Sequence, residues 1–257
     1  MNSHDAVAPL SAPLVRRFNA HHPWDRNFIL IYVLLIWFGI AMGFGPEIVR
    51  HVEKHAPPYP FIVHIHAAAF VGWLVLLSVQ VWLIRQHKAR IHRQLGVAGG
   101  VLAGAMVVLG PAAAFIVQRA RLGGPHSDPS FLSVQLTDIL AFAGLATAAI
   151  LCRKQSAAHK RLILLATLYI SDAGFSRWLG DPLQAVVGDG FGGTIAQLYL
   201  ANDLLILGLG VYDLMTRHRL HQAYIIGAVW IAAMQLSAVA LYENPLWKPI
   251  ALKLLGH

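Results

Sequence analysis

Charged residues are scarce in this 257-residue chain, and cysteine is almost absent. Asp, Glu, Lys and Arg make up 12% of the residues, about half their share in a typical soluble domain. A water-soluble fold needs more charge than this to cover its surface, so the composition excludes an ordinary soluble domain. The one cysteine, Cys152, excludes an internal disulfide and Cys-based zinc or iron–sulfur sites.

The motifs of several common enzyme classes are also missing. The chain has no Gly-x-Ser-x-Gly elbow, no Walker loop and no kinase signature. The segment RHVEKH lacks the HExxH spacing of a zinc protease. Residues 1–27 contain no early apolar core, so we expect a short tail there and no cleavable signal. Histidine is plentiful, with 14 copies, so a metal or haem site would use His and carboxylate ligands.

Long apolar runs dominate what is present. Hydrophobic residues make up 57% of the chain, and the mean hydropathy is +0.58. A helix needs about 20 apolar residues to cross the hydrocarbon layer of a membrane. We therefore predict an all-α, polytopic membrane bundle of about seven transmembrane helices in a domain over 28–243, with short tails at 1–27 and 244–257. The segments are 28–49, 60–84, 94–118, 131–152, 160–180, 194–216 and 222–243. The fifth is the weakest, because Asp172 and Arg177 lie in its second half.

The basic residues predict an orientation for this bundle. Most Lys and Arg lie in the N-terminal tail and in the loops after the second, fourth and sixth segments. Basic loops stay on the cytoplasmic side, so we predict the N-terminus inside and the C-terminus outside. The net charge of +8 is spread over these short loops, which indicates anionic membrane lipids as partners and argues against nucleic acid.

Ionisable residues inside the apolar segments are the main candidates for function. Such a residue costs at least a few kcal/mol to place in a membrane and therefore needs a partner. In the predicted topology, one set lies roughly 6–14 Å below the outer face, counting 1.5 Å per helical residue. The set comprises His64, His66, Asp138, Asp172 and Asp203.

These residues allow two functional interpretations and a structural one. We predict that His66, Asp138 and Asp203 hold a divalent metal, zinc or iron, with His64, Asp172 and Arg177 supporting them. Because His64 and His66 are about 200° apart on a helix, only His66 is expected to point into the bundle. Alternatively, the carboxylates bind protons in a proton-coupled carrier, which a broken helix in segment 160–180 would favour. The structural alternative is a buried ion pair, such as Arg177 with Asp172.

A second set of histidines lies at the predicted inner ends of the helices. His92, His159 and His221 each stand at the start of an apolar segment, after a basic loop. Two imidazoles on neighbouring helices can bind a haem iron. We predict His92 and His159 as ligands of a haem b, with solvated interfacial histidines as the alternative.

Three stretches carry a resemblance to known sequences: HAAAFVGWLVLLSVQVWLIRQHKARIHRQLG (66–96), HKRLILLATLYISDAGFSRW (159–178) and VYDLMTRHRLHQAY (211–224). They resemble a group of uncharacterised bacterial heptahelical membrane proteins, which implies a multi-pass protein of the bacterial inner (plasma) membrane. A looser likeness is to di-haem b-type membrane cytochromes, which implies His66, His92 and His159 as ligands. In those cytochromes, histidines pair across two helices at each membrane side, whereas here Asp138 and Asp203 stand at the outer counterpart positions.

From the sequence we therefore expect a membrane protein with a buried His/Asp site, acting as a metal- or haem-binding redox protein or enzyme. The alternatives are a proton-coupled carrier and a non-catalytic subunit that binds other membrane proteins.

Overall fold

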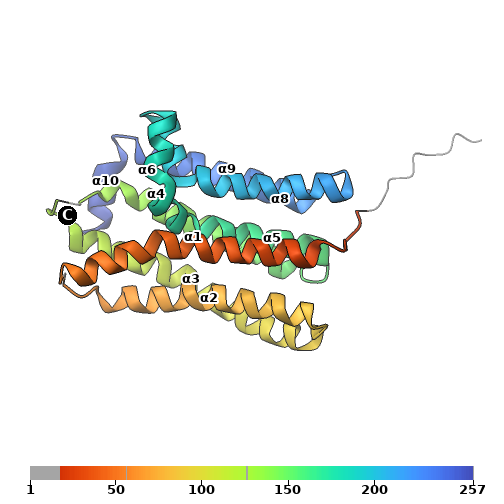
Figure 1. Cartoon of the computed structure of the whole chain (residues 1–257). Coiled ribbons are helices and arrows are strands. Elements are labelled where there is room, and N and C mark those ends of the chain that lie inside the picture. The colour runs from red at the N-terminus through yellow and green to blue at the C-terminus, as the bar shows by residue number, and fades with distance from the viewer. Residues whose placement is uncertain (1–17, 56, 126, 257) are drawn as a thin grey trace, which may run out of the picture.

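The computed structural model describes residues 18–55, 57–125 and 127–256. All the regular secondary structure in this part of the chain is helical, and the long helices lie side by side in one bundle (Figure 1). The helices are α1 (Asp25–Glu53), α2 (Phe61–Arg85), α3 (Ala89–Arg121), η1 (Pro129–Phe131), α4 (Leu132–Leu151), α5 (Ser156–Ile170), α6 (Asp172–Val187), α7 (Phe191–Ile195), η2 (Ala196–Leu200), α8 (Ala201–Arg217), α9 (Gln222–Tyr242) and α10 (Trp247–Leu254).

Six of these helical stretches are long and apolar enough to cross a membrane. They are α1, α2, α3, η1 with α4, α7 to α8, and α9. Each corresponds to one of the segments predicted from the sequence, within a few residues. The prediction of an all-α membrane bundle is therefore confirmed.

The fifth predicted segment differs from the others because its helix breaks at Ser171. Helix α5 has 15 residues, about 22 Å at 1.5 Å per residue, which is shorter than the hydrocarbon core of about 30 Å. It packs against α4, α8 and α9 and runs along the bundle, whereas α6 turns across it (Figure 1). The predicted single helix over 160–180 is therefore two helices that differ in direction.

The outer faces of the long helices are apolar. Val97 and Val101 on α3 are each 71% exposed, and α8 and α9 expose Leu207 and Val229 in the same way. Single apolar residues on a surface are ordinary, but continuous apolar faces mark contact with lipid or another protein. The inner faces form one core around Phe142, which α4, α5 and α9 share with the other helices.

Helices α1 and α6 approach each other closely through glycines. A Cβ atom on Gly43 would lie 2.1 Å from the carbonyl oxygen of Gly174, and one on Gly174 would lie 2.9 Å from that of Gly39. Gly39 and Gly43 are four residues apart, the small-residue spacing that allows close backbone approach in membranes. A residue with a side chain at these positions would keep α6 from crossing α1 so closely. The crossing therefore fixes the position of the α5–α6 break.

The two ends of the described chain lie at opposite ends of the bundle (Figure 1). The segment 244–257 was predicted to be a tail, but α10 lies there and packs on η1 and α9. The Trp247 indole donates a hydrogen bond of 3.0 Å to the Ser130 carbonyl, and Ala251 is fully buried against the bundle. The apolar residues of α10 explain why this short segment is ordered against the bundle.

Candidate functional site

The break between α5 and α6 is stabilised by polar side chains. The Ser171 hydroxyl donates to the Leu168 carbonyl at 2.6 Å, and the Asn202 amide donates to the same carbonyl. The last carbonyls of a helix lack their usual partners within it, and these two side chains add to the Ser171 N–H, which donates to the same Leu168 carbonyl at 3.0 Å. Ser171 and Asn202 are each 1% exposed. The helix break therefore lies in the buried core, at the residue immediately before Asp172, and side-chain hydrogen bonds stabilise it.

Two carboxyl groups meet at this break. Asp172 begins α6 and is buried, and its side chain lies beside that of Asp138 on α4. The Ala173 N–H donates to Asp172 at 2.6 Å, which holds the carboxyl group in place. Two neighbouring carboxyl groups can share one proton, because a protonated carboxyl group donates a hydrogen bond that an ionised carboxylate accepts.

Two tyrosines enclose the Asp138 side of this carboxyl pair. The Tyr199 hydroxyl donates to Asp138 Oδ1 at 3.2 Å, and the Tyr169 hydroxyl lies beside the same carboxyl group. Their rings stack with centroids 6.0 Å apart and planes at 11°. Tyr169 is 0% and Tyr199 1% exposed. These four side chains, Asp138, Asp172, Tyr169 and Tyr199, form what we call the carboxyl-pair site.

A local change of helix type presents Tyr199 to this site. Residues 196–200 form the π-helical turn η2 between α7 and α8. Such turns are rare in helices and often occur at functional sites. Because a π-turn accommodates one more residue than an α-turn, it rotates the side chains that follow. Here the altered turn carries Tyr199, with Asn202 one turn further along.

The structure does not bring the predicted metal ligands together. Within the described residues, no three His, Cys, Asp or Glu side chains gather closely enough to hold a metal ion. Asp138 faces Asp172 and the tyrosines, while Asp203 accepts a hydrogen bond of 2.8 Å from Gln235 on α9. His66 stacks on Phe70 and lies near the backbone of Leu109. Each of the three residues faces a different neighbour.

The supporting residues also separate. His64 is exposed, whereas His66 is partly buried, as expected for two residues on opposite faces of α2. Arg177 pairs with Glu47 of α1 at 2.9 Å and donates to the Ala173 carbonyl at 2.6 Å. The alternative ion pair between Arg177 and Asp172 is not seen among the described residues, because α6 crosses α1 and points Arg177 toward Glu47.

The inner histidines are brought together in part. The His92 and His159 rings lie 6.4 Å apart, centroid to centroid. The His221 ring lies elsewhere, edge-on to the Phe18 ring, with the two ring centroids 4.6 Å apart. Burial, followed by the positive charge of Arg161, lowers the pKa of His221. Its Nδ1 accepts a hydrogen bond of 3.0 Å from the Ala223 N–H, so the neutral ring caps α9.

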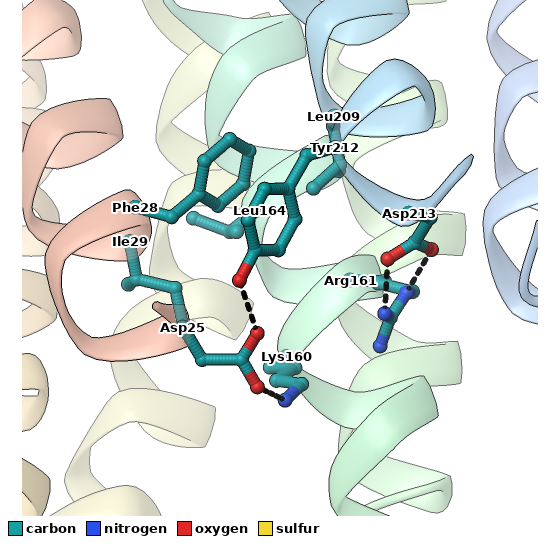
Figure 2. Close-up of a pocket in the computed structure, with 9 residues that line it drawn as sticks. All are labelled: Asp25, Phe28, Ile29, Lys160, Arg161, Leu164, Leu209, Tyr212 and Asp213. Carbon is teal, nitrogen blue, oxygen red and sulfur yellow. Dashed lines mark hydrogen bonds and ion pairs between the residues drawn. The ribbon is translucent and has the colours of Figure 1, made fainter. Parts of the chain in front are cut away.

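A network of charges at the same end of the bundle escaped the sequence analysis. Figure 2 shows Asp25 between Tyr212 and Lys160, with the Arg161–Asp213 pair beside it. Asp25 lies 2.7 Å from the Tyr212 hydroxyl and 2.6 Å from Lys160 Nζ. Asp213 is 0% exposed and pairs with Arg161, which is 2% exposed. The signal in the sequence is an acidic residue at the inner end of an apolar helix, next to basic loops.

The segment before α1 covers this network. The Arg217 guanidinium donates to both Asp25 oxygens, at 2.7 and 2.8 Å, and also to the Asn19 carbonyl at 2.9 Å. Phe18 lies over the Arg161 guanidinium at 4.6 Å. Such contacts between a cation and an aromatic ring strengthen when water is excluded. The predicted tail over 1–27 is thus attached to the bundle from Phe18 onward, and residues 1–17 lie outside the described part.

Fold and site together define a polytopic helical membrane protein with a buried carboxyl pair. Comparison with protein families, with curated proteins and with solved structures finds no match for this chain. Its function is therefore argued from the geometry of its own residues.

Proposed function

We propose that the protein is a proton-coupled membrane carrier, in which Asp138 and Asp172 bind and release the coupling proton. The observation that carries this proposal is the meeting of the two carboxyl groups at a helix break. Ionisable residues inside membrane bundles are costly and typical of proton and ion pathways. Broken helices are typical of the binding sites of secondary transporters.

The shared proton gives the site two states. With one proton, the carboxyl pair carries a single negative charge and is held together by a hydrogen bond. Without it, two negative charges repel each other in a poorly hydrated core, where electrostatic interactions are strong. Loss of the proton therefore favours separation of Asp172 from Asp138. Because Asp172 is the first residue of α6, that separation would move α6 relative to α4.

A route for the proton to one membrane surface begins at the same helix. Arg177 and Glu47 form an ion pair one turn beyond Asp172, with side chains 42% and 38% exposed. The opposite direction along α5 is closed by buried apolar residues such as Leu165 and Leu168. In the state described, the proton is proposed to exchange with the Glu47 side. Combined with the charge distribution of the loops, this is the outer side of a bacterial inner membrane.

Proton flux into liposomes tests the proposal directly. The purified protein is reconstituted with a trapped pH-sensitive dye, and a potassium diffusion potential drives protons inward. We expect Asp138→Asn and Asp172→Asn each to lower the protein-dependent flux at least tenfold, because neither variant can share a proton between two carboxyl groups. Asp203→Asn is the matched control, since Asp203 is paired with Gln235 outside the site.

A measurement of the bound proton itself complements the flux assay. Infrared difference spectroscopy between the parent and the double variant Asp138→Asn with Asp172→Asn should show at neutral pH the carbonyl band of a protonated carboxylic acid, present in the parent and absent from the double variant. The variants are first checked by size-exclusion chromatography for an intact fold. A parent protein without this band, or a band that survives both substitutions, would show that the pair holds no proton.

A further inference from the structure

A pair of imidazoles lies at the other end of the bundle from the carboxyl-pair site. His92 is the fourth residue of α3, and His159 is the fourth residue of α5. Their ring centroids are 6.4 Å apart and their planes are at 82°. On α5, His159 precedes Asp172 by about 20 Å, counting 1.5 Å per residue. The pair is thus separate from the site proposed to bind protons.

The hydrogen bond of His159 defines which of its nitrogens is free. Its Nδ1 lies 2.8 Å from the Ala149 carbonyl oxygen at the end of α4. A carbonyl only accepts hydrogen bonds, so Nδ1 carries the hydrogen and Nε2 keeps its lone pair in the neutral ring. A ring N–H held by a backbone carbonyl is the usual arrangement behind a metal-binding histidine.

His92 differs from His159 in its Nδ1. The His92 ring lies near the backbone of Gln80 on α2, and its Nδ1 is buried and has no partner within the described part of the chain. The Gln80 side-chain oxygen is also buried there without a partner. That side chain lies over Gly96, one turn beyond His92 on α3. Buried polar atoms are nearly always satisfied, so two unsatisfied atoms on adjoining side chains indicate that something binds between them.

We propose that His92 and His159 bind one transition-metal centre, as a bare ion or as the iron of a haem. Neutral imidazole suits zinc, copper and iron, with metal–nitrogen bonds of about 2.0–2.1 Å for zinc. Two rings 6.4 Å apart leave room for one metal atom bonded to both. A water molecule on a bare ion would donate the hydrogen bond that the Gln80 oxygen lacks.

Metal binding by the full-length protein in detergent tests this inference. After chelator treatment, Zn²⁺, Cu⁺ under reducing conditions and haemin are added separately, and bound metal is measured per chain. We expect about one equivalent of one of these probes, with at least tenfold weaker binding in His92→Gln and in His159→Gln. His64→Gln, an exposed histidine on α2, serves as the control and should bind as the parent does.

The three probes distinguish a haem iron from a bare metal ion. A haemin complex with sharp reduced bands assigns the site to haem, whereas saturation by Zn²⁺ or Cu⁺ alone assigns it to a bare ion. X-ray absorption of the loaded parent protein should show two imidazole nitrogens, a result that does not depend on how well the variants fold. Binding of none of the probes, or equal binding in both His variants and the parent, would overturn the inference.

Discussion

Asp213 and Arg161 form a deeply buried ion pair, with 0% and 2% of each residue exposed, and the Arg217 guanidinium lies 3.6 Å from the same carboxylate. Replacing a buried pair with apolar residues is often harmless, but removing one partner leaves an uncompensated charge. The Arg161 guanidinium also donates to the Ala157 carbonyl at 2.7 Å, so it cannot move easily into water. This ion pair therefore matters for stability because both of its charges are buried, and not only because they are opposite.

We expect Asp213→Asn to destabilise the protein by about 3–5 kcal/mol, because it leaves the Arg161 charge buried and unpaired. Denaturant unfolding of the purified protein in detergent, followed by tryptophan fluorescence, measures the change. The double variant Arg161→Met with Asp213→Leu is the control and should recover most of the loss. If Asp213→Asn is as stable as the parent protein, the Arg161–Asp213 pair must be hydrated in the membrane.

His221 gives the same end of the bundle a dependence on pH. Its folded-state pKa is lowered, first by burial and then by the Arg161 charge. Below the ordinary value of about 6.5, the unfolded chain takes up a proton that the folded chain does not. The stability contributed by the neutral ring is therefore complete above about pH 6.5 and is lost as the pH falls through this value.

We accordingly expect the thermal stability of the parent protein to fall between pH 7 and pH 5. The His221→Asn variant retains a side chain that caps a helix but does not titrate, so its melting temperature should fall less over this range. His64→Asn removes an exposed histidine and should leave the parental pH dependence unchanged. Equal slopes for the parent and His221→Asn would assign the pH dependence to other groups.

At the scale of elements, the crossing of α1 and α6 determines where Asp172 lies. An added Cβ on Gly43 would meet the Gly174 carbonyl at 2.1 Å, and a backbone atom cannot shift without moving its helix. A Cβ added to Gly45, two residues further along α1, would have no neighbouring atom within 4 Å. The two glycines therefore provide a matched pair within a single helix.

We expect Gly43→Ala to destabilise the protein by about 1–3 kcal/mol through overpacking, whereas Gly45→Ala should be neutral or slightly stabilising, since alanine favours helix. Gly43→Ala should also move Asp172 away from Asp138 and so weaken the infrared band of the shared proton. Unfolding experiments and infrared spectra on the same two preparations measure both effects. Indistinguishable variants would contradict the close contact between α1 and α6.

The sequence predicted the elements better than their contacts. The length of each apolar run determines where a membrane helix begins and ends, so the long helices were placed within a few residues. The direction of α6 was not predictable, because it depends on Gly39 and Gly43, which are far from α6 in the sequence. Spacing alone does not identify such a crossing: Gly96, Gly100 and Gly104 on α3 are also four residues apart, yet a Cβ added at any of them would come no closer than 3.7 Å to a neighbour.

The sequence identified the ionisable candidates but not which of them meet. Counting residues placed Asp138, Asp172, Asp203 and His66 in one layer, but contact depends on how each helix is rotated. Asp138 and Asp172 face each other, while Asp203 turns to Gln235. Tyr169 and Tyr199 were missed, because an aromatic residue in an apolar helix resembles ordinary core. Only the structure shows that both hydroxyl groups turn toward a carboxyl group.

At the scale of the whole molecule, the course of the chain determines which loops share a membrane side. The start of α1 and the C-terminus lie at opposite ends of the bundle (Figure 1). This arrangement requires α5, although it is too short to span alone, to carry the chain toward the far end before α6 turns. Loops with more Lys and Arg usually lie inside, which predicts that the connections after α2 and α4 face the cytoplasm.

Cysteine labelling tests this arrangement in cells, after Cys152→Ser removes the native thiol. A membrane-impermeant maleimide should label Lys54→Cys and Lys253→Cys in intact bacteria, because these exposed positions lie at the predicted outer end. Lys88→Cys and Lys154→Cys, also exposed, should react only after the membrane is permeabilised. The reverse labelling pattern would show that the bundle has the opposite orientation, while Lys54 and Lys253 would still share one membrane side and Lys88 and Lys154 the other. Labelling of Lys253→Cys together with Lys88→Cys would instead mean that α5 and α6 return the chain to its starting side, and the carboxyl pair would then lie at the tip of a re-entrant hairpin.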